Sequence, residues 1–401
     1  MTTPVLVTGL GVVSPHGSDP QAMFSALMRA ESAVRPVFEG QLPKPAAAAT
    51  ASFDESRWFT KLQLAGVDRV SQLAVAAADM ALKDAGVTLD GERTGVYGGC
   101  GMGGAAALEA AYRSGGRVPP LTIPAFMPNA PASHVAMRLG VKGPVLTYSV
   151  ACASSAVALA EAAKAVQRGE VDVAIAGGSE ALIVPGVVLA WQAMQTLAPF
   201  NPGEAASACK PFATDRAGFV LGEGAAFVVL ESAARAKARG ARTYGELAGW
   251  GISCDATHLT KPDAAGQARA LRQALATAGM APAEVGYCNA HGTATKIGDV
   301  VEAEALAAVW GSALPGLRVS STKALHGHLL GAAGALEAVI TLLALQRQEL
   351  PPNAFCREVD PACPLNLVRE NGTKAPGLQA AVSSSFAFGG TNAALLFRRT
   401  P

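Results

Sequence analysis

Cys152 lies between an apolar segment, residues 144–150, and an alanine-rich helical pattern, residues 156–168, that ends at Gly169. We interpret these segments as a buried strand and a helix. A thiol at the start of a helix lies among unpaired backbone N–H groups at the positive end of the helix dipole. This position favours the thiolate and leaves N–H groups to hold an oxyanion. A free cysteine is more commonly a buried, inert residue, so Cys152 alone does not decide the chemistry.

Two histidine segments occur much further along the chain. His291 follows a short apolar run, residues 285–288, and His328 follows another, residues 317–320. Each histidine is therefore predicted at the end of a strand that leads through a loop into a helix, where parallel α/β sheets place their functional groups. One cysteine and two histidines on such turns indicate a site for covalent catalysis by a thiol.

Five ordered motifs resemble those of the elongating β-ketoacyl-acyl carrier protein synthases, of the synthase II type, within the thiolase-like condensing enzymes. They are found at residues 5–14, 151–155, 218–225, 321–323 with 327–334, and 386–392. The resemblance covers nearly the whole chain. It implies an α/β, thiolase-like fold in which two similar halves form five layers in the order α-β-α-β-α.

The alternation of short apolar runs with helical patterns is typical of βαβ units. We expect an N-terminal half at residues 1–240, which carries the cysteine, and a C-terminal half at residues 241–401, which carries both histidine motifs. A charged, alanine-rich segment, residues 232–242, joins them. Residues 40–58 are rich in proline and alanine and are expected to form a loop or insertion.

Composition excludes several other classes of protein. A formal charge of +1 over 401 residues gives no basic field for nucleic acid. The seven cysteines are scattered without CxxC pairs, and no signal peptide is predicted. We therefore expect a cytoplasmic protein with neither a disulfide framework nor a metal site. The apolar stretch at residues 329–345 carries Glu337 and is expected to be a buried helix, not a membrane span.

The resemblance implies a decarboxylative Claisen condensation in fatty acid or polyketide-type chain elongation. Malonyl-acyl carrier protein would react with an acyl chain on Cys152 to give 3-oxoacyl-acyl carrier protein. Both substrates would arrive on the 4′-phosphopantetheine of acyl carrier protein, with no other bound cofactor. His291 and His328 would donate Nε2–H groups to the enolate oxygen left when carbon dioxide departs. The backbone N–H groups of Cys152 and Phe388 would hold the oxyanion of the acyl thioester.

Two further residues take supporting roles by resemblance. Lys323 would hold the second histidine through a polar network that includes Glu337. Asp299 and Glu302 fall near the start of the helix that follows His291, where they are either acids favoured by the helix dipole or buried partners that support the structure of the site, and we expect the second.

The substrate-binding residues are assigned in the same way. Thr293 and Thr295 resemble the pair that binds the pantetheine arm. Met102, Phe386 and Phe388 would line the acyl pocket, with Met102 limiting the length of the chain.

Residues 99–104 satisfy the GxGxxG pattern of dinucleotide sites and follow an apolar run. A dinucleotide site also needs an acidic residue at a second strand end, about 20 residues further on, and this chain has neither there. We interpret the segment as a tight glycine turn that allows close packing. Cys100, within it, is a second candidate nucleophile but lacks the helix start that favours Cys152.

Several positions depart from the family pattern. His326 stands where threonine is common, either as an unligated loop histidine or as a group that alters the pH dependence of the site. Ala387 replaces a glycine, and a positive φ there would strain it. Lys296, Ala213 and Ala217 replace a proline and two aspartates. These changes favour a specialised synthase.

Two other functions share this resemblance. A non-elongating, chain-length-factor-like subunit of a heterodimer would usually lack the nucleophile that this chain retains. A coenzyme A-dependent thiolase would need a second catalytic cysteine in the C-terminal glycine-rich loop, and residues 388–392 contain none. A homodimer is expected, a heterodimer with a related subunit stays open, and neither nucleic acid nor membrane is an expected partner.

Overall fold

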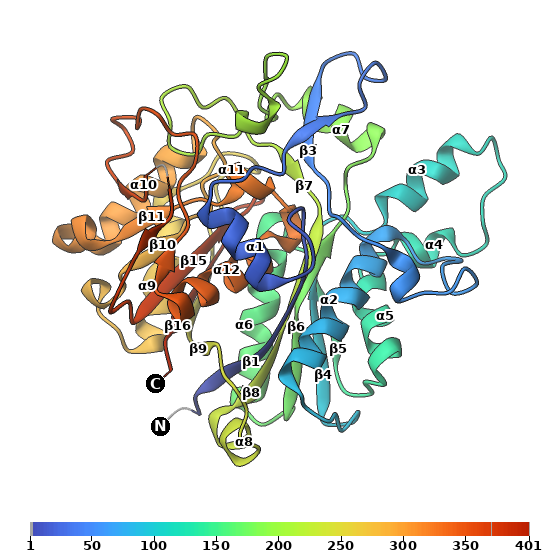
Figure 1. Ribbon diagram of the computed structural model, residues 1–401, viewed down its shortest axis with the longest axis horizontal. Coiled ribbons are helices and arrows are strands. Elements are labelled where there is room, and N and C mark those ends of the chain that lie inside the picture. Colours follow the sequence, from blue (N-terminus) through green and yellow to red (C-terminus); the bar gives the residue numbers. More distant parts are fainter. Residues whose placement is uncertain (1–2, 370, 401) are drawn as a thin grey trace.

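The computed structural model describes residues 3–369 and 371–400. Its main feature is a sheet of eleven strands within that described part, built from two similar halves (Figure 1). The strands of the first half lie in the order β1 (Val5–Val13), β8 (Gly224–Ser232), β6 (Val173–Glu180), β4 (Thr94–Gly99) and β5 (Val145–Tyr148). Those of the second lie in the order β9 (Gly245–Cys254), β16 (Thr391–Arg398), β15 (Ala380–Phe386), β10 (Tyr287–Asn289), β11 (Arg318–Ser320) and β13 (Asn366–Leu367).

The two half-sheets have the same connectivity. In each, the first and last long strands are antiparallel neighbours, and the last is antiparallel to a strand that begins a parallel set. This set has three strands in the first half and four in the second, where β13 is added at the edge. The halves meet where β1 pairs with β9, through Leu6 opposite Glu246 and Val7 opposite Gly245. The two similar halves implied by the motifs are therefore present. The division at residue 240 itself stays a prediction.

Helices form three layers around the half-sheets, as Figure 1 shows. The first half-sheet is covered on its outer face by α2 (Arg69–Ala85) and α5 (Ala130–Leu139), and the second by α9 (Ala264–Ala278) and α10 (Gly298–Trp310). Between the half-sheets lie α6 (Ser154–Gln167) and α12 (Ala333–Arg347). This is the predicted five-layer α-β-α-β-α order, and the predicted fold class is confirmed.

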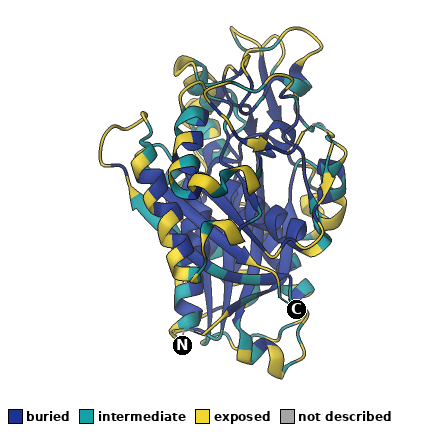
Figure 2. Ribbon diagram, turned by 90° about the vertical axis from the view of Figure 1, so that its left-hand side faces the viewer, coloured by how far each residue is buried: buried dark blue, intermediate teal, exposed yellow. Residues whose placement is uncertain are grey.

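The central layer is the most deeply buried part of the chain (Figure 2). The stretch Leu330–Arg347 is long and apolar enough to cross a membrane by length and composition, but 89% of it is buried inside the protein. It is a core helix, as predicted. A Cβ at Gly334 would lie 2.8 Å from the Cβ of Ala156, so glycine at this position lets α12 approach α6 closely.

Shorter elements surround these layers and complete the chain. They are α1 (Pro20–Met28), β2 (Arg35–Val37), β3 (Ala46–Ala49), α3 (Ala105–Arg113), α4 (Thr122–Phe126), α7 (Pro185–Ala193), β7 (Leu221–Gly222), α8 (Ala233–Ala238), α11 (Lys323–His326), β12 (Glu349–Leu350) and β14 (Thr373–Lys374).

Two local expectations are wrong. Residues 40–58 are not entirely loop, because β3 pairs with β2 and β7 in a small sheet; pairing outweighs the weak strand preference of four alanines. The predicted strand at residues 144–150 exists as β5 but is not buried. It lies at the edge of the main sheet, where Val145 and Leu146 are 36% and 45% exposed. The helix predicted after it ends as expected, with Gly169 at a φ of +70°.

Candidate active site

The structure brings Cys152, His291 and His328 together from three turns that are far apart in the sequence. Cys152 lies in a short turn, Ala151–Ala153, that leads into α6. His328 Nε2 lies 3.1 Å from Cys152 Sγ, and the His291 and His328 rings meet edge to face with centroids 5.3 Å apart. One side-chain N or S atom of each residue lies within 4.8 Å of the other two.

A backbone contact determines which nitrogen of His328 carries the proton. The N–H of Leu330 donates to His328 Nδ1 at 3.3 Å, so Nδ1 is an acceptor without a proton. In the neutral ring the proton is therefore on Nε2, which faces the sulfur of Cys152. This is the tautomer that a donor to an enolate oxygen requires.

Burial determines the protonation of the nucleophile. It raises the pKa of the Cys152 thiol to about 12, against the opposing effects of the Lys323 charge and a hydrogen bond from the backbone N–H of Phe388. The expectation of a thiolate stabilised by the helix start is therefore wrong, because desolvation outweighs the helix in this buried turn. The resting nucleophile is a thiol, which must lose its proton when it attacks.

Both histidines are neutral. Burial, followed by the positive charge of Lys323, lowers the pKa of His291 and of His328 well below the ordinary value of histidine. Two neutral imidazoles can donate hydrogen bonds to an oxygen that becomes negative without first forming ion pairs with it.

Lys323 and Glu337 form a fully buried ion pair beside the histidines. Lys323 begins α11 and Glu337 lies in the second turn of α12. Burial raises the pKa of Glu337 to about 7, with the charge of Lys323 acting in the opposite direction. The pair places one fixed positive charge close enough to lower the pKa values of both histidines and to oppose the rise at Cys152.

Glu302 and Asp299 line the same cavity as the three reactive residues, and both accept hydrogen bonds from backbone N–H groups. Glu302 accepts the N–H groups of His291 and Gly292 at 2.8 and 2.7 Å and the hydroxyl of Ser384 at 2.8 Å. Asp299 accepts the N–H of Phe212 at 2.7 Å. Their role as structural support of the site stays a prediction.

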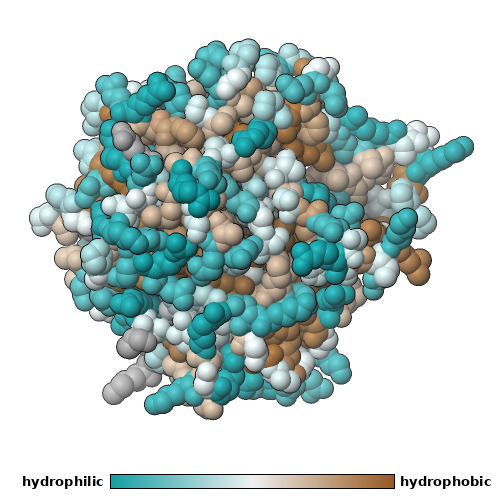
Figure 3. Space-filling model, in the orientation of Figure 1, coloured by the Kyte–Doolittle hydropathy of each residue, from teal (hydrophilic) through white to brown (hydrophobic). Residues whose placement is uncertain are grey.

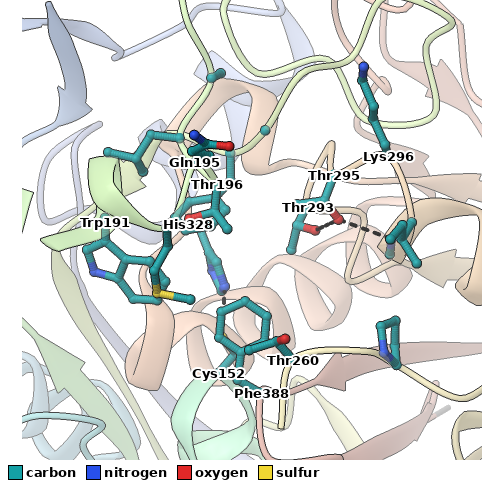
Figure 4. Close-up of a pocket in the computed structure, with 18 of the residues that line it drawn as sticks. Cys152, Trp191, Gln195, Thr196, Thr260, Thr293, Thr295, Lys296, His328 and Phe388 are labelled. Carbon is teal, nitrogen blue, oxygen red and sulfur yellow. Dashed lines mark hydrogen bonds between the residues drawn. The ribbon is translucent and has the colours of Figure 1, made fainter. Parts of the chain in front are cut away.

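The loop after β15 covers the nucleophile. In Figure 4 the ring of Phe388 lies in front of Cys152, and it stacks on Trp191 with centroids 6.1 Å apart. The ring of Phe386 lies 6.1 Å from that of His291. Gly389 and Gly390 take the positive φ angles of this loop and Ala387 does not, so the predicted strain at Ala387 is absent.

A cavity of about 850 Å³ opens onto the three reactive residues. Thr293 and Thr295 face it with their hydroxyl oxygens 3.1 Å apart, and Lys296 projects at its rim (Figure 4). Among the described residues that line the cavity, Cys152 is the one cysteine, so the second thiol that a thiolase would need is not there.

The sequence matches two consecutive domain families. Residues 2–236 match the β-ketoacyl synthase N-terminal domain, and residues 244–357 match the β-ketoacyl synthase C-terminal domain. The chain belongs to the β-ketoacyl synthase family.

Similar proteins agree with this membership. Nodulation protein E of Rhizobium sp. (strain N33) is 40% identical over 98% of this chain and 99% of its own length. The 3-oxoacyl-[acyl-carrier-protein] synthase 2 of Staphylococcus aureus (strain COL) is 35% identical over 98% of both chains.

Two solved structures resemble this one over 100% of both chains. One is the ishigamide ketosynthase/chain length factor, with a TM-score of 0.92 and 32% identity. The other is a type II polyketide synthase acyl-carrier protein in complex with its ketosynthase bound to the hexaketide, with a TM-score of 0.91 and 29% identity.

One predicted pocket residue of this β-ketoacyl synthase is misplaced. Met102 is 47% exposed and does not line the cavity. Glu180 holds the glycine turn that contains Met102, because the backbone N–H of Met102 lies 3.4 Å from Glu180 Oε1. The single chain therefore does not place Met102 in the cavity, and its role in limiting the length of the acyl chain stays a prediction.

The glycine turn at residues 99–104 serves packing, as interpreted. A Cβ at Gly99 would lie 2.3 Å from the N of Ser155, so glycine allows β4 to meet the start of α6. Cys100 is buried, and burial together with the Glu180 charge raises its pKa well above that of an ordinary cysteine. Unlike Cys152, Cys100 does not line the cavity, so it is not placed to attack a substrate there.

Sequence reasoning missed three residues of the synthase site: Trp191, Glu180 and Asp360. The carboxylate of Asp360 lies 2.6 Å from Arg216, which in turn donates to the carbonyl oxygens of Thr295 and Lys296. Asp360 thus supplies a carboxylate to Arg216 although Ala213 and Ala217 do not. Glu180 could have been found from the sequence, because it is a carboxylate at the end of an apolar strand. No feature of the sequence indicated Asp360, which lies in a loop 144 positions from Arg216.

His326 is neither a loop histidine nor a titrating group at neutral pH. It is buried, its Nδ1 lies 2.7 Å from the carbonyl oxygen of Gly327, and its Nε2 lies 2.9 Å from the hydroxyl of Thr322. Burial, then Lys323, lowers the pKa of His326 to about 3. It stays neutral, with Nδ1–H donating to the carbonyl.

Proposed function

We propose that this β-ketoacyl synthase condenses malonyl-acyl carrier protein with an acyl chain on Cys152 and releases carbon dioxide and 3-oxoacyl-acyl carrier protein. The observation that carries the proposal is the cluster of one thiol and two neutral imidazoles in the wall of one cavity. Relatives named 3-oxoacyl-acyl carrier protein synthase support it.

The first half-reaction loads the enzyme. Cys152 Sγ attacks the thioester carbonyl of the acyl carrier, the new S–C bond forms, and the carrier thiol leaves with the proton that Cys152 gives up. The oxyanion of this step would lie against the backbone N–H groups of Cys152 and Phe388, the second of which already points at the sulfur.

The second half-reaction makes the carbon–carbon bond. Malonyl thioester loses carbon dioxide, and the Nε2–H of His328, with a ring N–H of His291, donates to the enolate oxygen that results. The enolate carbon attacks the carbonyl of the acyl-Cys152. The tetrahedral intermediate then collapses, which breaks the S–C bond and returns the thiolate for reprotonation.

The prosthetic arm of the carrier fits the cavity wall formed by Thr293 and Thr295. Two hydroxyls 3.1 Å apart match the amide groups of pantetheine, which are hydrogen-bond donors and acceptors. The substrates would therefore be held by the acyl carrier protein and its arm, with no further cofactor.

A second copy of this chain is the partner that we propose for the exposed edge of the main sheet. The edge strand β5 is unpaired on its outer side within the described residues, and edges of this kind favour pairing with another chain. Exposed apolar side chains lie on the turn after β4 and on or beside α3, α4 and α5, of which α5 packs against β5: Met102, Tyr112, Leu121, Ile123, Met127 and Met137. Figure 3 shows hydrophobic surface on the side of the molecule where α3 and α4 lie in Figure 1. A dimer formed here would cover Met102 and restore its predicted place beside an acyl channel.

Sedimentation of the purified protein tests the dimer. Leu146→Lys places a charge on the edge strand and is expected to give monomers, whereas Leu62→Lys, at an exposed position in another loop, is expected to leave the dimer intact. Co-purification with a related subunit would instead identify a heterodimer. We also propose a cytoplasmic location, supported by seven cysteines that are all free.

The decisive experiment incubates the protein with acyl carrier proteins bearing different acyl chains and then adds malonyl-carrier. We expect an acyl adduct on the protein, carbon dioxide release and a product two carbons longer than the primer. Absence of both adduct and product for every primer would contradict the function, and adduct without condensation would favour a non-elongating subunit.

A further inference from the structure

Glu180, the last residue of β6, is a fully buried carboxylate that no step of the proposed reaction uses. Its Oε2 accepts the N–H of Gly101 at 2.8 Å and that of Gly331 at 3.0 Å. Its Oε1 lies 3.4 Å from the N of Met102 and 3.7 Å from the sulfur of Cys100. The carboxylate thus joins the glycine turn after β4 to the turn that precedes α12.

The fit of this carboxylate is close. A Cβ at Gly101 would lie 2.6 Å from Glu180 Oε2, and a Cβ at Gly331 would lie 2.5 Å from the same oxygen. Both positions therefore require glycine, and the carboxylate touches the backbone of each turn directly.

One of these turns controls the tautomer of His328. Leu330 has a φ of +48°, which is uncommon for a non-glycine residue and persists where surrounding contacts hold it. Its N–H donates to His328 Nδ1, and the next N–H along the chain, that of Gly331, donates to Glu180. The two contacts fix successive peptide groups of one turn.

We propose that Glu180 is a positioning residue of the condensation. By holding Gly331, it keeps the N–H of Leu330 on His328 Nδ1, and so keeps the proton of His328 on Nε2, where it faces Cys152 and the enolate. This inference rests on the proposed function, because it assigns Glu180 a part in the work of His328.

A glutamine at this position separates shape from charge. Its side chain has the shape of glutamate, but one of its two terminal atoms is an NH₂ group, which cannot accept a hydrogen bond. With its amide oxygen at the position of Oε2, this glutamine keeps the N–H contacts of both glycines, so it is the control for the loss of charge. Glu180→Leu removes the acceptor and breaks the contact with Gly331. Its matched control is Glu161→Leu, which removes a partly exposed carboxylate on α6 whose ion pair is with Lys164.

The test combines spectroscopy with kinetics. In protein labelled with ¹⁵N-histidine, the His328 signals are assigned by their loss in His328→Ala and report which ring nitrogen carries the proton. We expect the Nε2–H form in the wild type, in Glu161→Leu and in Glu180→Gln, and a mixture with the Nδ1–H form in Glu180→Leu. The kcat for malonyl-carrier decarboxylation should fall roughly 10- to 100-fold in Glu180→Leu, with KM unchanged.

Two results would overturn the proposal: an Nδ1–H form in the wild type, or a folded Glu180→Leu with the wild-type tautomer and kcat. If Glu180→Leu does not fold, Glu180→Asp is judged by the same readouts, because its shorter carboxylate keeps the charge but does not reach both turns. The proposed function is tested separately. If the wild type shows the Nε2–H signal but no decarboxylation, the function is refuted, and loss of that signal in the Glu180 variant would still support the coupling between Glu180 and His328.

Discussion

The turns that precede the two central helices have the same backbone form and different chemistry. Ala151 and Leu330 each have a φ of +48°, each begins a short 3₁₀ turn, and each turn leads directly into a helix of the middle layer. The next residue is Cys152 in the first half and Gly331 in the second. One turn presents a thiol to the cavity, and the other presents a bare N–H to Glu180.

The helices that follow these turns depend on each other. Ser155 Oγ of α6 accepts the N–H of Ala335 of α12 at 2.9 Å, and Gly334 lies against Ala156. The start of one helix therefore fixes the start of the other. Because both turns end at this contact, Cys152 and His328 are brought within hydrogen-bond distance although they are 176 positions apart in the chain.

The comparison separates what the repeated fold provides from what the residues provide. Both halves supply a strained turn, a buried helix and parallel strand ends, but the first half supplies the nucleophile, and the second supplies both imidazoles and the buried ion pair. The position in α6 that corresponds to Glu337 of α12 is Ala158, which is buried and apolar. The two halves have similar backbones but different side chains, and together they form a single site.

Removing the thiol tests the first turn most severely. Cys152→Ala should abolish acyl transfer to the protein and reduce condensation by more than about 10⁴-fold, because the nucleophile has no substitute in the cavity. Cys100→Ala should keep the adduct, since Cys100 is buried beside Glu180 and does not line the cavity. Intact-protein mass spectra measure both, and an adduct that survives Cys152→Ala would refute the assignment.

Breaking the ion pair tests what distinguishes α12 from α6. Lys323→Met leaves the carboxylate of Glu337 buried without its partner and should lower the free energy of unfolding by about 3–5 kcal/mol. The double variant Lys323→Met, Glu337→Leu makes the core of α12 apolar, like that of α6, and should recover most of this loss. Urea unfolding of the three proteins measures it, and a double variant no more stable than Lys323→Met would contradict the argument.

The histidines of the second half should separate the two half-reactions. His291→Ala and His328→Ala each remove a donor to the enolate oxygen and should slow malonyl-carrier decarboxylation by about 10²–10³-fold. Acyl transfer to Cys152 should survive better than condensation in at least one variant, because the Phe388 N–H remains. Release of labelled carbon dioxide gives the first rate, and wild-type decarboxylation in both variants would remove them from the mechanism.

Local pattern was sufficient for much of this site. Cys152, His291 and His328 each lie on a turn between a strand and a helix, and the strand and helix patterns around them are strong, so their turns were predicted correctly. Glu302 and Asp299 were also predicted as support, because acids in the first turns of a helix are near the loop that precedes it.

What local pattern missed depends on contacts between distant segments. The thiol of Cys152 was expected to ionise from its place at a helix start, but the desolvation that prevents this comes from the whole cavity. Met102 lies in the glycine turn that the sequence predicts, but its exposure depends on the position of β5 at the edge of the sheet, which the sequence does not reveal. Asp360 reaches Arg216 from 144 residues away, a distance over which sequence spacing carries no signal.

The smallest predicted effect concerns His326, which separates a buried histidine from a catalytic one. Its pKa of about 3 lies below the unfolded value, so unfolding takes up a proton, and stability is lost as pH falls from about 6.5 towards 3. His326→Asn keeps a donor for the carbonyl of Gly327 but cannot take up that proton. The variant should therefore lose about 2 kcal/mol less stability than the wild type between pH 7.5 and pH 5. Its rate profile between pH 6 and 8 should match that of the wild type, because His326 is neutral throughout that range. Urea unfolding at the two pH values, with rates measured in parallel, checks both expectations, and a shifted rate profile with unchanged acid sensitivity would place the titrating group in the reaction instead.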